Sequence, residues 1–298
     1  MDTYGWDKGG DKALLKFILD VLRGIVIGIA NVIPGVSGGT MMVSMGVYDD
    51  IIGSINNLFK QFKKSILTLL PYVIGMLIGI VGFAKAIEML FEKFPIPTAL
   101  LFIGLIFGGI PMMWKRATKK KIDVLSVILF ALFFALVIGL QFLGNMEGVD
   151  KSLDFSIPHM FIGLLIGVVA AATMIIPGVS GSMVMMVLGY YNTIIAAINL
   201  AVDSLVSADF PGLFKAAGIL APFGIGVVVG IFAVAKLIHW LLKNHEAKTY
   251  CAILGLVVAS PYPVYVNSGV TSVTTIAVII GIIMFAVGFF GALKLGEK

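Results

Sequence analysis

The chain has 298 residues, of which 59% are hydrophobic and only 12% are charged, and its formal net charge is +5. Charged residues supply about 25% of an ordinary soluble domain, and a soluble fold of this length could not bury so much apolar surface in one core. The composition therefore excludes a soluble enzyme and indicates an integral membrane protein. The single cysteine excludes a disulfide framework, and the basic residues gather in short loops, which is typical of membrane orientation signals and not of nucleic-acid binding.

Apolar segments recur along the whole chain, and most approach the roughly 20 helical residues that cross a bilayer core. In the first half we expect segments at 13–33, 38–57, 66–91, 98–114 and 122–143. In the second half we expect them at 157–176, 180–200, 215–242, 249–265 and 271–293. The sequence thus predicts an all-α polytopic membrane protein with one transmembrane domain over residues 1–298.

An internal repeat is the strongest feature of the sequence. Ile33-Pro34-Gly35-Val36-Ser37-Gly38-Gly39 returns as Ile176-Pro177-Gly178-Val179-Ser180-Gly181-Ser182, and further matches follow in the same order. So many ordered matches indicate a duplication, with repeat one at 13–143 and repeat two at 157–293. Each repeat is expected to hold a broken or re-entrant helix pair followed by three transmembrane helices.

The charges of the loops predict how the repeats are oriented. Lysine and arginine mark the loops near 60–64, 115–121 and 243–248 and the C-terminus as cytoplasmic, whereas the acidic loops at 144–156 and 201–214 are expected outside. The alternation gives each half an odd number of crossings, so the second repeat is expected to be inverted relative to the first. Inverted repeats are a recurrent transporter architecture, with the substrate site near the middle of the membrane. We expect a multi-pass protein of the cytoplasmic membrane.

Both copies of the motif break an apolar segment at a Pro-Gly pair, Pro34-Gly35 and Pro177-Gly178. Proline removes a backbone donor and ends a helix, and unsatisfied backbone survives in a membrane only where protein or a polar cavity surrounds it. Re-entrant hairpins and pairs of full crossings both agree with the loop charges, so this alternative stays open.

The residues that follow each break suit an anion. Each set is expected to open a helix, whose N-terminus presents free N–H groups and partial positive charge, and the hydroxyls add donors. The alternative is that these small residues only permit close helix crossing and capping. The candidate anion site consists of Pro34, Gly35, Ser37, Gly38, Gly39 and Thr40 from the first copy and Pro177, Gly178, Ser180, Gly181 and Ser182 from the second.

A few charged residues lie in or near the apolar segments. Lys85 and Lys236 occupy equivalent positions and either reach to the membrane surface or supply accessory charge to an anionic headgroup. Arg23 has Asp20 three residues before it and is either half of an interfacial ion pair or a phosphate-binding guanidinium. Asp49 suggests a loop or interface role, or proton coupling on one side.

Motifs of catalysis are missing from the sequence. It contains no H-E-x-x-H, no Walker loop and no G-x-S-x-G, and no Asp, Glu or His cluster has the spacing of metal ligands. We therefore expect a transporter that is not an enzyme and that has neither a metal nor a cofactor.

The stretch Gly28-Ile29-Ala30-Asn31-Val32-Ile33-Pro34-Gly35-Val36-Ser37-Gly38-Gly39-Thr40, followed by Gly46-Val47-Tyr48-Asp49, resembles the bacterial and archaeal polyprenyl-phosphate transporter family, the undecaprenyl phosphate translocases. The resemblance covers essentially the whole chain. The second copy departs from it, with Ser182-Met183 in place of Gly39-Thr40, so the two sites are expected to contribute unequally.

The resemblance implies that undecaprenyl phosphate moves from the outer to the inner leaflet of the cytoplasmic membrane for reuse in envelope polymers. The expected partners are a polyprenyl phosphate lipid and the membrane, and the oligomeric state stays open, with a homodimer as one alternative. Within the candidate site we expect Ser37, Gly38, Ser180, Gly181 and Arg23 to surround the phosphate.

Two rival functions remain from the sequence. Undecaprenyl pyrophosphate phosphatases are similar in their broken helices and in a Pro-Gly-x-Ser motif, but that motif continues with an arginine where this chain has Gly38 and Gly181. The second rival is a carrier of small ions that the Ser and Gly breaks coordinate.

Overall fold

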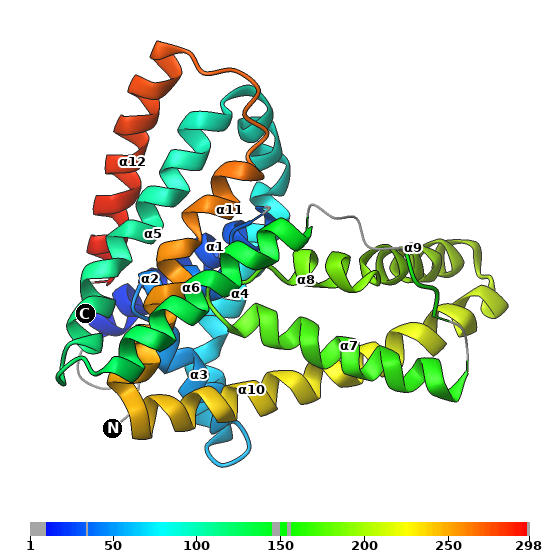
Figure 1. Cartoon of the computed structure of the whole chain (residues 1–298). Coiled ribbons are helices and arrows are strands. Elements are labelled where there is room, and N and C mark those ends of the chain that lie inside the picture. Colours follow the sequence, from blue (N-terminus) through cyan, green and yellow to red (C-terminus); the bar gives the residue numbers. More distant parts are fainter. Residues whose placement is uncertain (1–9, 34, 145–149, 154–155, 297–298) are drawn as a thin grey trace.

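The computed structural model describes residues 10–33, 35–144, 150–153 and 156–296, and all regular elements in these ranges are helices (Figure 1). The predicted all-α fold is confirmed. Six of the described helices are long and apolar enough to cross a membrane, and one further pair of short helices meets the same test as a bent unit. Pro34 lies outside the described residues.

The twelve described helices follow the two predicted halves. The first half holds α1 (Gly10–Val32), α2 (Gly38–Ser44), α3 (Tyr48–Asn56), α4 (Phe62–Lys93), α5 (Pro95–Ala117) and α6 (Val124–Gly144). The second half holds α7 (Ile157–Ile175), α8 (Gly181–Leu188), α9 (Tyr191–Ser207), α10 (Phe210–Ala259), α11 (Pro261–Val266) and α12 (Thr275–Gly296).

The prediction of single segments at 38–57 and 180–200 was wrong, because each is two helices. Gly46 and Gly189 adopt left-handed φ angles of +68° and +80°, and the N–H of the next residue donates to a carbonyl five residues back, Val47 to Met42 and Tyr190 to Met185, at 3.0 Å each. This is the glycine-dependent helix ending known as the Schellman motif. It bends the chain between α8 and α9 by 106°.

The boundaries at 201–214, 215–242 and 249–265 also need correction. The chain stays helical in α9 to Ser207 and resumes at Phe210, so little of the expected loop remains. The next two expected segments share the long helix α10, which is kinked at His245, where φ and ψ are not helical. A new short helix, α11, begins at Pro261, as expected where proline cannot continue the hydrogen bonding of the preceding turns.

Equivalent glycines in the two halves bring equivalent helices into close contact. α1 lies along α4, and α7 lies along the first part of α10 (Figure 1). A Cβ added to Gly75 would lie closer than 3.0 Å to the Val21 carbonyl, and one added to Gly226 would lie equally close to the Leu164 carbonyl. Only glycine permits such an approach. The packing therefore agrees with a duplication, while the inversion of one half across a membrane stays a prediction.

The last helix of each half packs on the other half. α12 lies along α5, and α6 lies along the second part of α10. Glycines again form the contacts: Gly104 adjoins the Phe285 carbonyl, and Gly255 adjoins the Phe130 carbonyl. This exchange of helices joins the halves and holds the segments that carry the two motif copies beside each other.

Candidate functional site

The two helix breaks meet inside the molecule. The first lies between α1 and α2 and the second between α7 and α8. The N–H of Gly178 donates to Thr40 Oγ1 at 2.7 Å, and the Ser37 hydroxyl donates to the Ile176 carbonyl at 3.5 Å. Residues 138 or more apart in the chain are thus in direct contact. The structure brings these members of the two predicted sets together.

The Gly after each motif proline holds the backbone in a conformation that other residues rarely adopt. Gly35 has φ +82° and Gly178 has φ +76°. A Cβ would lie 2.7 Å from the Pro263 carbonyl oxygen at the first position and 2.6 Å from the Leu256 carbonyl oxygen at the second. Both glycines are therefore required by the turn and by the close approach of a neighbouring backbone.

The first copy is buried, and its polar groups have partners within the protein. Ser37 is 6% exposed and Thr40 is fully buried. The N–H of Gly38, at the start of α2, donates to the Asn31 side-chain oxygen at 3.2 Å, and Gly39 adjoins the Ile175 carbonyl. These contacts make the first copy part of the core.

The second copy is more accessible. Ser180, Gly181 and Ser182 are half-buried, and α8 contains no fully buried residue. The hydroxyls of Ser180 and Ser182 lie 3.0 Å apart and bond to each other. A void of only about 10 Å³ lies between Gly35, Gly178 and Ser180, which is room for about one water. A phosphate group needs more space, so binding between the breaks requires them to move apart.

Arg23 lies outside this cluster. It is 8% exposed, and its guanidinium donates to Asp20 at 2.9 Å and to the Leu295 carbonyl, near the end of α12, at 3.0 Å from Nε. The Tyr72 hydroxyl also donates to Asp20, at 2.8 Å. The ion pair considered from the sequence is therefore present, but it is buried and joins α1, α4 and α12. Nine residues, or about 13 Å of helix, separate Arg23 from the end of α1.

Asp49 joins a charged interface and does not face the breaks. Its carboxylate accepts hydrogen bonds from Arg116 and from the Tyr250 hydroxyl, the latter at 2.9 and 3.0 Å. Arg116 also lies 3.7 Å from Glu246 and over the Tyr250 ring. This network links α3, α5 and α10. Sequence reasoning used Arg116 only for orientation, because nothing in the local pattern reveals a partner 67 residues away.

Lys85 and Lys236 are both exposed, on α4 and α10. Neither forms an ion pair or hydrogen bond with another residue that the structure describes. Their placement agrees with side chains that reach the membrane surface. No cluster of three His, Cys, Asp or Glu side chains that could hold a metal occurs within the described residues.

Sequence reasoning missed the contact of Asn31 with the Gly38 N–H and a polar contact of Tyr48 at the breaks. The Tyr48 hydroxyl, buried at the start of α3, donates to the Ile175 carbonyl at the end of α7, at 3.2 Å. It satisfies a helix-terminal carbonyl that would otherwise lack a partner. Tyr48 and Tyr191 are equivalent in the repeat, and that match was the available signal.

An all-helical chain with six candidate spans and two joined polar breaks defines a polytopic membrane protein of the transporter type. The family model described as "VCA0040-like: Undecaprenyl phosphate translocase-like" matches residues 27–279, and the chain belongs to this family. The expectation of a transporter in place of an enzyme is thereby confirmed.

Two curated relatives extend over most of the chain. A Staphylococcus aureus protein named "Polyprenyl-phosphate transporter" is 29% identical over 282 residues, covering 94% of this chain and 96% of its own length. A Vibrio cholerae protein of the same name is 27% identical over 261 residues, covering 83% of this chain and 77% of its own length. No solved structure matches the chain.

Proposed function

We propose that this protein moves undecaprenyl phosphate, or a related polyprenyl phosphate, from the outer to the inner leaflet of the cytoplasmic membrane, so that the carrier lipid is reused in envelope synthesis. The name of the matching family and the names of the two relatives support the substrate class. The observation that carries the proposal is the direct contact between the two polar breaks, through Thr40 and Gly178.

A phosphate needs such a site because an unpaired charge is costly to bury in hydrocarbon. If the breaks separate, the bond between Thr40 Oγ1 and the Gly178 N–H is released, and a hydroxyl and an N–H then face one space. The donors replace water around the phosphate, while the isoprenoid chain stays in lipid.

The second copy supplies the more accessible part of the proposed site. Ser180, Gly181 and Ser182 are half-buried and would reach the phosphate first. Ser37, Gly38, Gly39 and Thr40 form the opposite wall, and Gly35 and Gly178 set the turns. We leave Arg23 and Asp49 out of this site because both are engaged elsewhere. Lys85 and Lys236 are proposed as surface charges that attract the headgroup.

The basic loops support the proposed orientation. The segments at 60–64 and 115–121 and the C-terminus would lie in the cytoplasm, with repeat two, 157–293, inverted relative to repeat one, 13–143. Movement of lipid from the outside inward then ends on the side where the basic loops lie.

The test is translocation in vesicles that contain the purified protein and a fluorescent polyprenyl phosphate, with dithionite to quench the outer leaflet. We expect the wild type to accelerate exchange between leaflets. The double variant Ser180→Ala/Ser182→Ala should be at least about tenfold slower, since a hydrogen bond to a charged group contributes about 1.5–3 kcal/mol. Its melting temperature should not change.

The matched control is Ser207→Ala, which removes an exposed hydroxyl bonded only to the Asp203 carbonyl at the end of α9. This variant should move the lipid at the wild-type rate. Absence of acceleration by the wild type would reject lipid translocation, and uptake of inorganic phosphate by the same vesicles would then favour the ion carrier. Depletion of the protein in cells should raise the amount of polyprenyl phosphate exposed at the outer surface, which tests the direction.

A further inference from the structure

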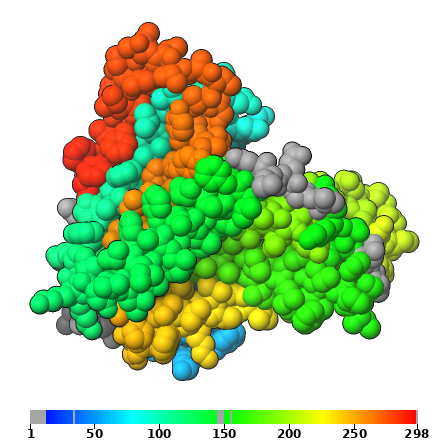
Figure 2. Space-filling model, viewed as in Figure 1, coloured from blue at the N-terminus to red at the C-terminus, as the bar shows by residue number. Residues whose placement is uncertain are grey.

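A long apolar groove lies between α6 and α10 and reaches the candidate site only at Pro177 of the second helix break. Its volume is about 490 Å³, and its walls are formed by Leu129 and Phe133 of α6 and by Leu237, Leu241 and Ala252 of α10. Figure 2 shows α6 in green crossing one face of the molecule beside the yellow and orange α10. Its size falls within the range of about 300–1,000 Å³ that is typical of small-molecule sites.

One end of the groove reaches the second helix break. Ile176 and Pro177 line it there, together with Tyr48, whose hydroxyl bonds to the Ile175 carbonyl. The groove is therefore continuous with the segment where the two motif copies meet. A chain that occupied it would have one end beside the proposed path of the phosphate.

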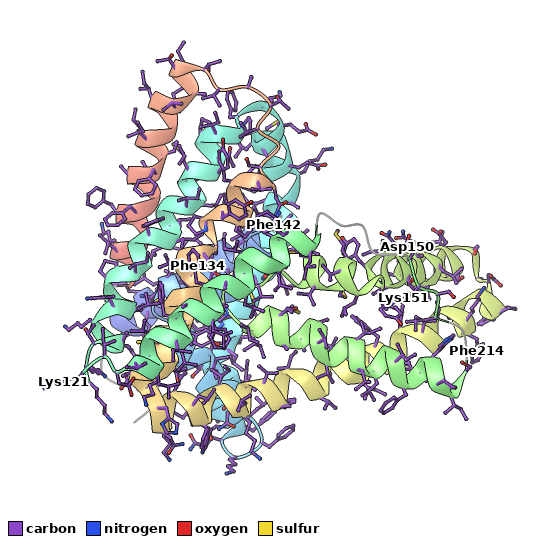
Figure 3. All side chains as sticks on the ribbon, viewed as in Figure 1. Lys121, Phe134, Phe142, Asp150, Lys151 and Phe214 are labelled. Atoms are coloured by element: carbon purple, nitrogen blue, oxygen red, sulfur yellow. The ribbon has the colours of Figure 1, made fainter. Side chains whose placement is uncertain are left out.

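The other end of the groove is polar and holds a lysine. His245, where α10 is kinked, and Lys248 line it. Lys248 Nζ lies 2.8 Å from the Asp123 carboxylate, and the lysine side chain is 37% exposed. Figure 3 places Lys121 at this end of α6 and Phe142 at the opposite end. The basic loop at 115–121 thus adjoins the polar end of the groove.

We propose that this groove binds a polyprenyl monophosphate of the leaflet next to the basic loops, with its phosphate at Lys248 and its isoprenoid chain along α6 and α10 toward Pro177. The proposal deepens the proposed function and rests on it. The groove would receive the lipid after its headgroup leaves the paired breaks, or before it enters them in the reverse direction.

The charges at the polar end favour a phosphate over a neutral lipid. In this structure Asp123 forms an ion pair with Lys248. Hydrogen bonds from Lys248 and Ser126 hold the pKa of the Asp123 carboxyl below its ordinary value. The carboxylate is an anion on an exposed loop, so an anionic headgroup can displace it from Lys248 without leaving a buried charge. The remaining lining is mainly apolar, and the hydroxyls of Tyr48 and Thr249 that line it already donate to backbone carbonyls, as suits a hydrocarbon chain.

A smaller crevice lies at the corresponding place between α5 of the first half and α12 of the second. It lies between the beginnings of α5 and α12, has a volume of about 320 Å³ and is lined by Lys93 at one edge. Its lining includes no residue of either helix break. Of these two cavities, the α6–α10 groove is the one whose described lining connects a cation with a break, which favours it for the lipid that is in transit.

The first test needs no variant. Wild-type protein in phospholipid vesicles would be photocrosslinked with a polyprenyl phosphate that carries a diazirine near the end of its chain, and the modified peptides would be mapped by mass spectrometry. We expect modification within residues 125–133 and 237–256, with competition by unlabelled polyprenyl phosphate and much weaker competition by polyprenol or inorganic phosphate. Modification confined to other helices, or none, would overturn the proposal, and equal competition by a two-chain anionic phospholipid would assign the groove to bulk lipid.

Two pairs of variants complete the test. Leu129→Trp fills the groove, whereas Leu132→Trp adds the same side chain on an exposed face of α6, where Leu132 is 59% exposed. Crosslinking should fall to background in Leu129→Trp and should be unchanged in Leu132→Trp. Lys248→Gln should weaken the competition by unlabelled polyprenyl phosphate about tenfold, as the loss of a charge-assisted hydrogen bond predicts. Lys243→Gln should leave this competition unchanged. Wild-type crosslinking in Leu129→Trp would overturn the proposal.

The translocation assay separates this proposal from the function on which it rests. If the wild type moves the lipid but no crosslink lies in the groove, the function holds and the groove proposal fails. If the groove is labelled but the wild type moves no lipid, the protein binds polyprenyl phosphate and the proposed translocation fails.

Discussion

The two copies of the motif share the sequence Pro-Gly-Val-Ser-Gly but have different surroundings. In the first copy, Ser37 is 6% exposed and Thr40 is fully buried. In the second copy, Ser180 and Ser182 are half-buried, and α8 contains no buried residue. Identical local sequence thus sets the same turn in both halves, while tertiary packing decides how exposed each turn is.

The reason lies in what each short helix contacts. α2 packs against α1 and α5 within the main core, whereas α8 contacts mainly α6, α7 and α9. The helices before the breaks also differ: Asp20 and Arg23 of α1 form a buried ion pair, and the equivalent positions of α7 hold Gly163 and Ile166. Regions with fewer buried contacts open at lower free-energy cost. We therefore expect the first copy to act as the fixed side of the site and the second as the side that opens.

The largest change in stability is expected at the Asp20–Arg23 ion pair of the first half, whose equivalent positions in the second half are Gly163 and Ile166. Arg23→Ala leaves the buried Asp20 carboxylate without its guanidinium partner and removes the donor to the Leu295 carbonyl. Breaking a buried pair in this way costs about 3–5 kcal/mol. We expect a much lower melting temperature in detergent, with the loss of transport following from the loss of structure.

The control for Arg23→Ala is Arg116→Ala. Arg116 also pairs with an aspartate, but its side chain is 29% exposed, so its loss should cost about 1 kcal/mol or less. Adding Asp20→Asn to Arg23→Ala should recover part of the stability, because it removes the uncompensated charge. Normal melting with abolished transport in Arg23→Ala would contradict the structural role and return Arg23 to the phosphate site.

The next largest change in stability is expected at the paired breaks, where a variant of the first copy is compared with a variant of the second. Thr40→Val preserves shape but removes the acceptor of the Gly178 N–H, and an unsatisfied buried donor costs about 1–3 kcal/mol. Ser182→Ala removes a half-buried hydroxyl whose partner is Ser180, so the change in stability should stay within about 0.5 kcal/mol. Thermal unfolding and vesicle transport should be measured on the same preparations.

We expect the two variants to separate stability from transport. Thr40→Val should lower the melting temperature, and Ser182→Ala should slow transport at an unchanged melting temperature. If Ser182→Ala melts earlier than Thr40→Val, then the second copy is the fixed side and the comparison is reversed.

The sequence predicted what depends on short-range chemistry. Long apolar segments revealed the membrane helices, and Pro34-Gly35 and Pro177-Gly178 marked the helix breaks because proline and glycine act on their immediate neighbours. The second pair of breaks, after Gly46 and Gly189, was also local and could have been found from the duplicated Gly, since a glycine often ends a helix in a left-handed turn.

What the sequence could not predict depends on contacts between distant residues. Arg23 bonds to a carbonyl 272 residues away, and its local pattern with Asp20 fitted an interfacial pair equally well. Asp49 likewise finds Arg116 and Tyr250 on two other helices. The groove between α6 and α10 arises because the last helix of each half packs against a helix of the other half. Periodicity and spacing contain no information on that exchange.

The smallest change in stability is expected at the polar contacts that hold the two helix pairs after the breaks, α2 with α3 and α8 with α9. Asp49, at the start of α3, bonds to Arg116 and Tyr250, whereas the equivalent Asn192, near the start of α9, donates to Asp150 at 3.0 Å. Figure 3 shows Asp150 and Lys151 beside α9. Asp49→Asn should cost only about 0.2–1 kcal/mol, because its side chain is 31% exposed and the pair is partly solvated.

The reciprocal variant, Asn192→Asp, places a second carboxylate against Asp150 and replaces a hydrogen bond by repulsion. Both groups are exposed, so salt should screen the repulsion. We expect Asn192→Asp to lower the melting temperature at low ionic strength and to approach the wild type at high ionic strength. The small loss of stability in Asp49→Asn should shrink at high ionic strength, because salt also weakens the Asp49–Arg116 pair of the wild type. A salt-independent loss in Asn192→Asp would mean that the contact with Asp150 does not hold α9. The second unit would then be held by its apolar packing and by the hydrogen bonds of Lys151 with Gly189 and Thr193, and the side that opens would have to be identified from α8 and α7.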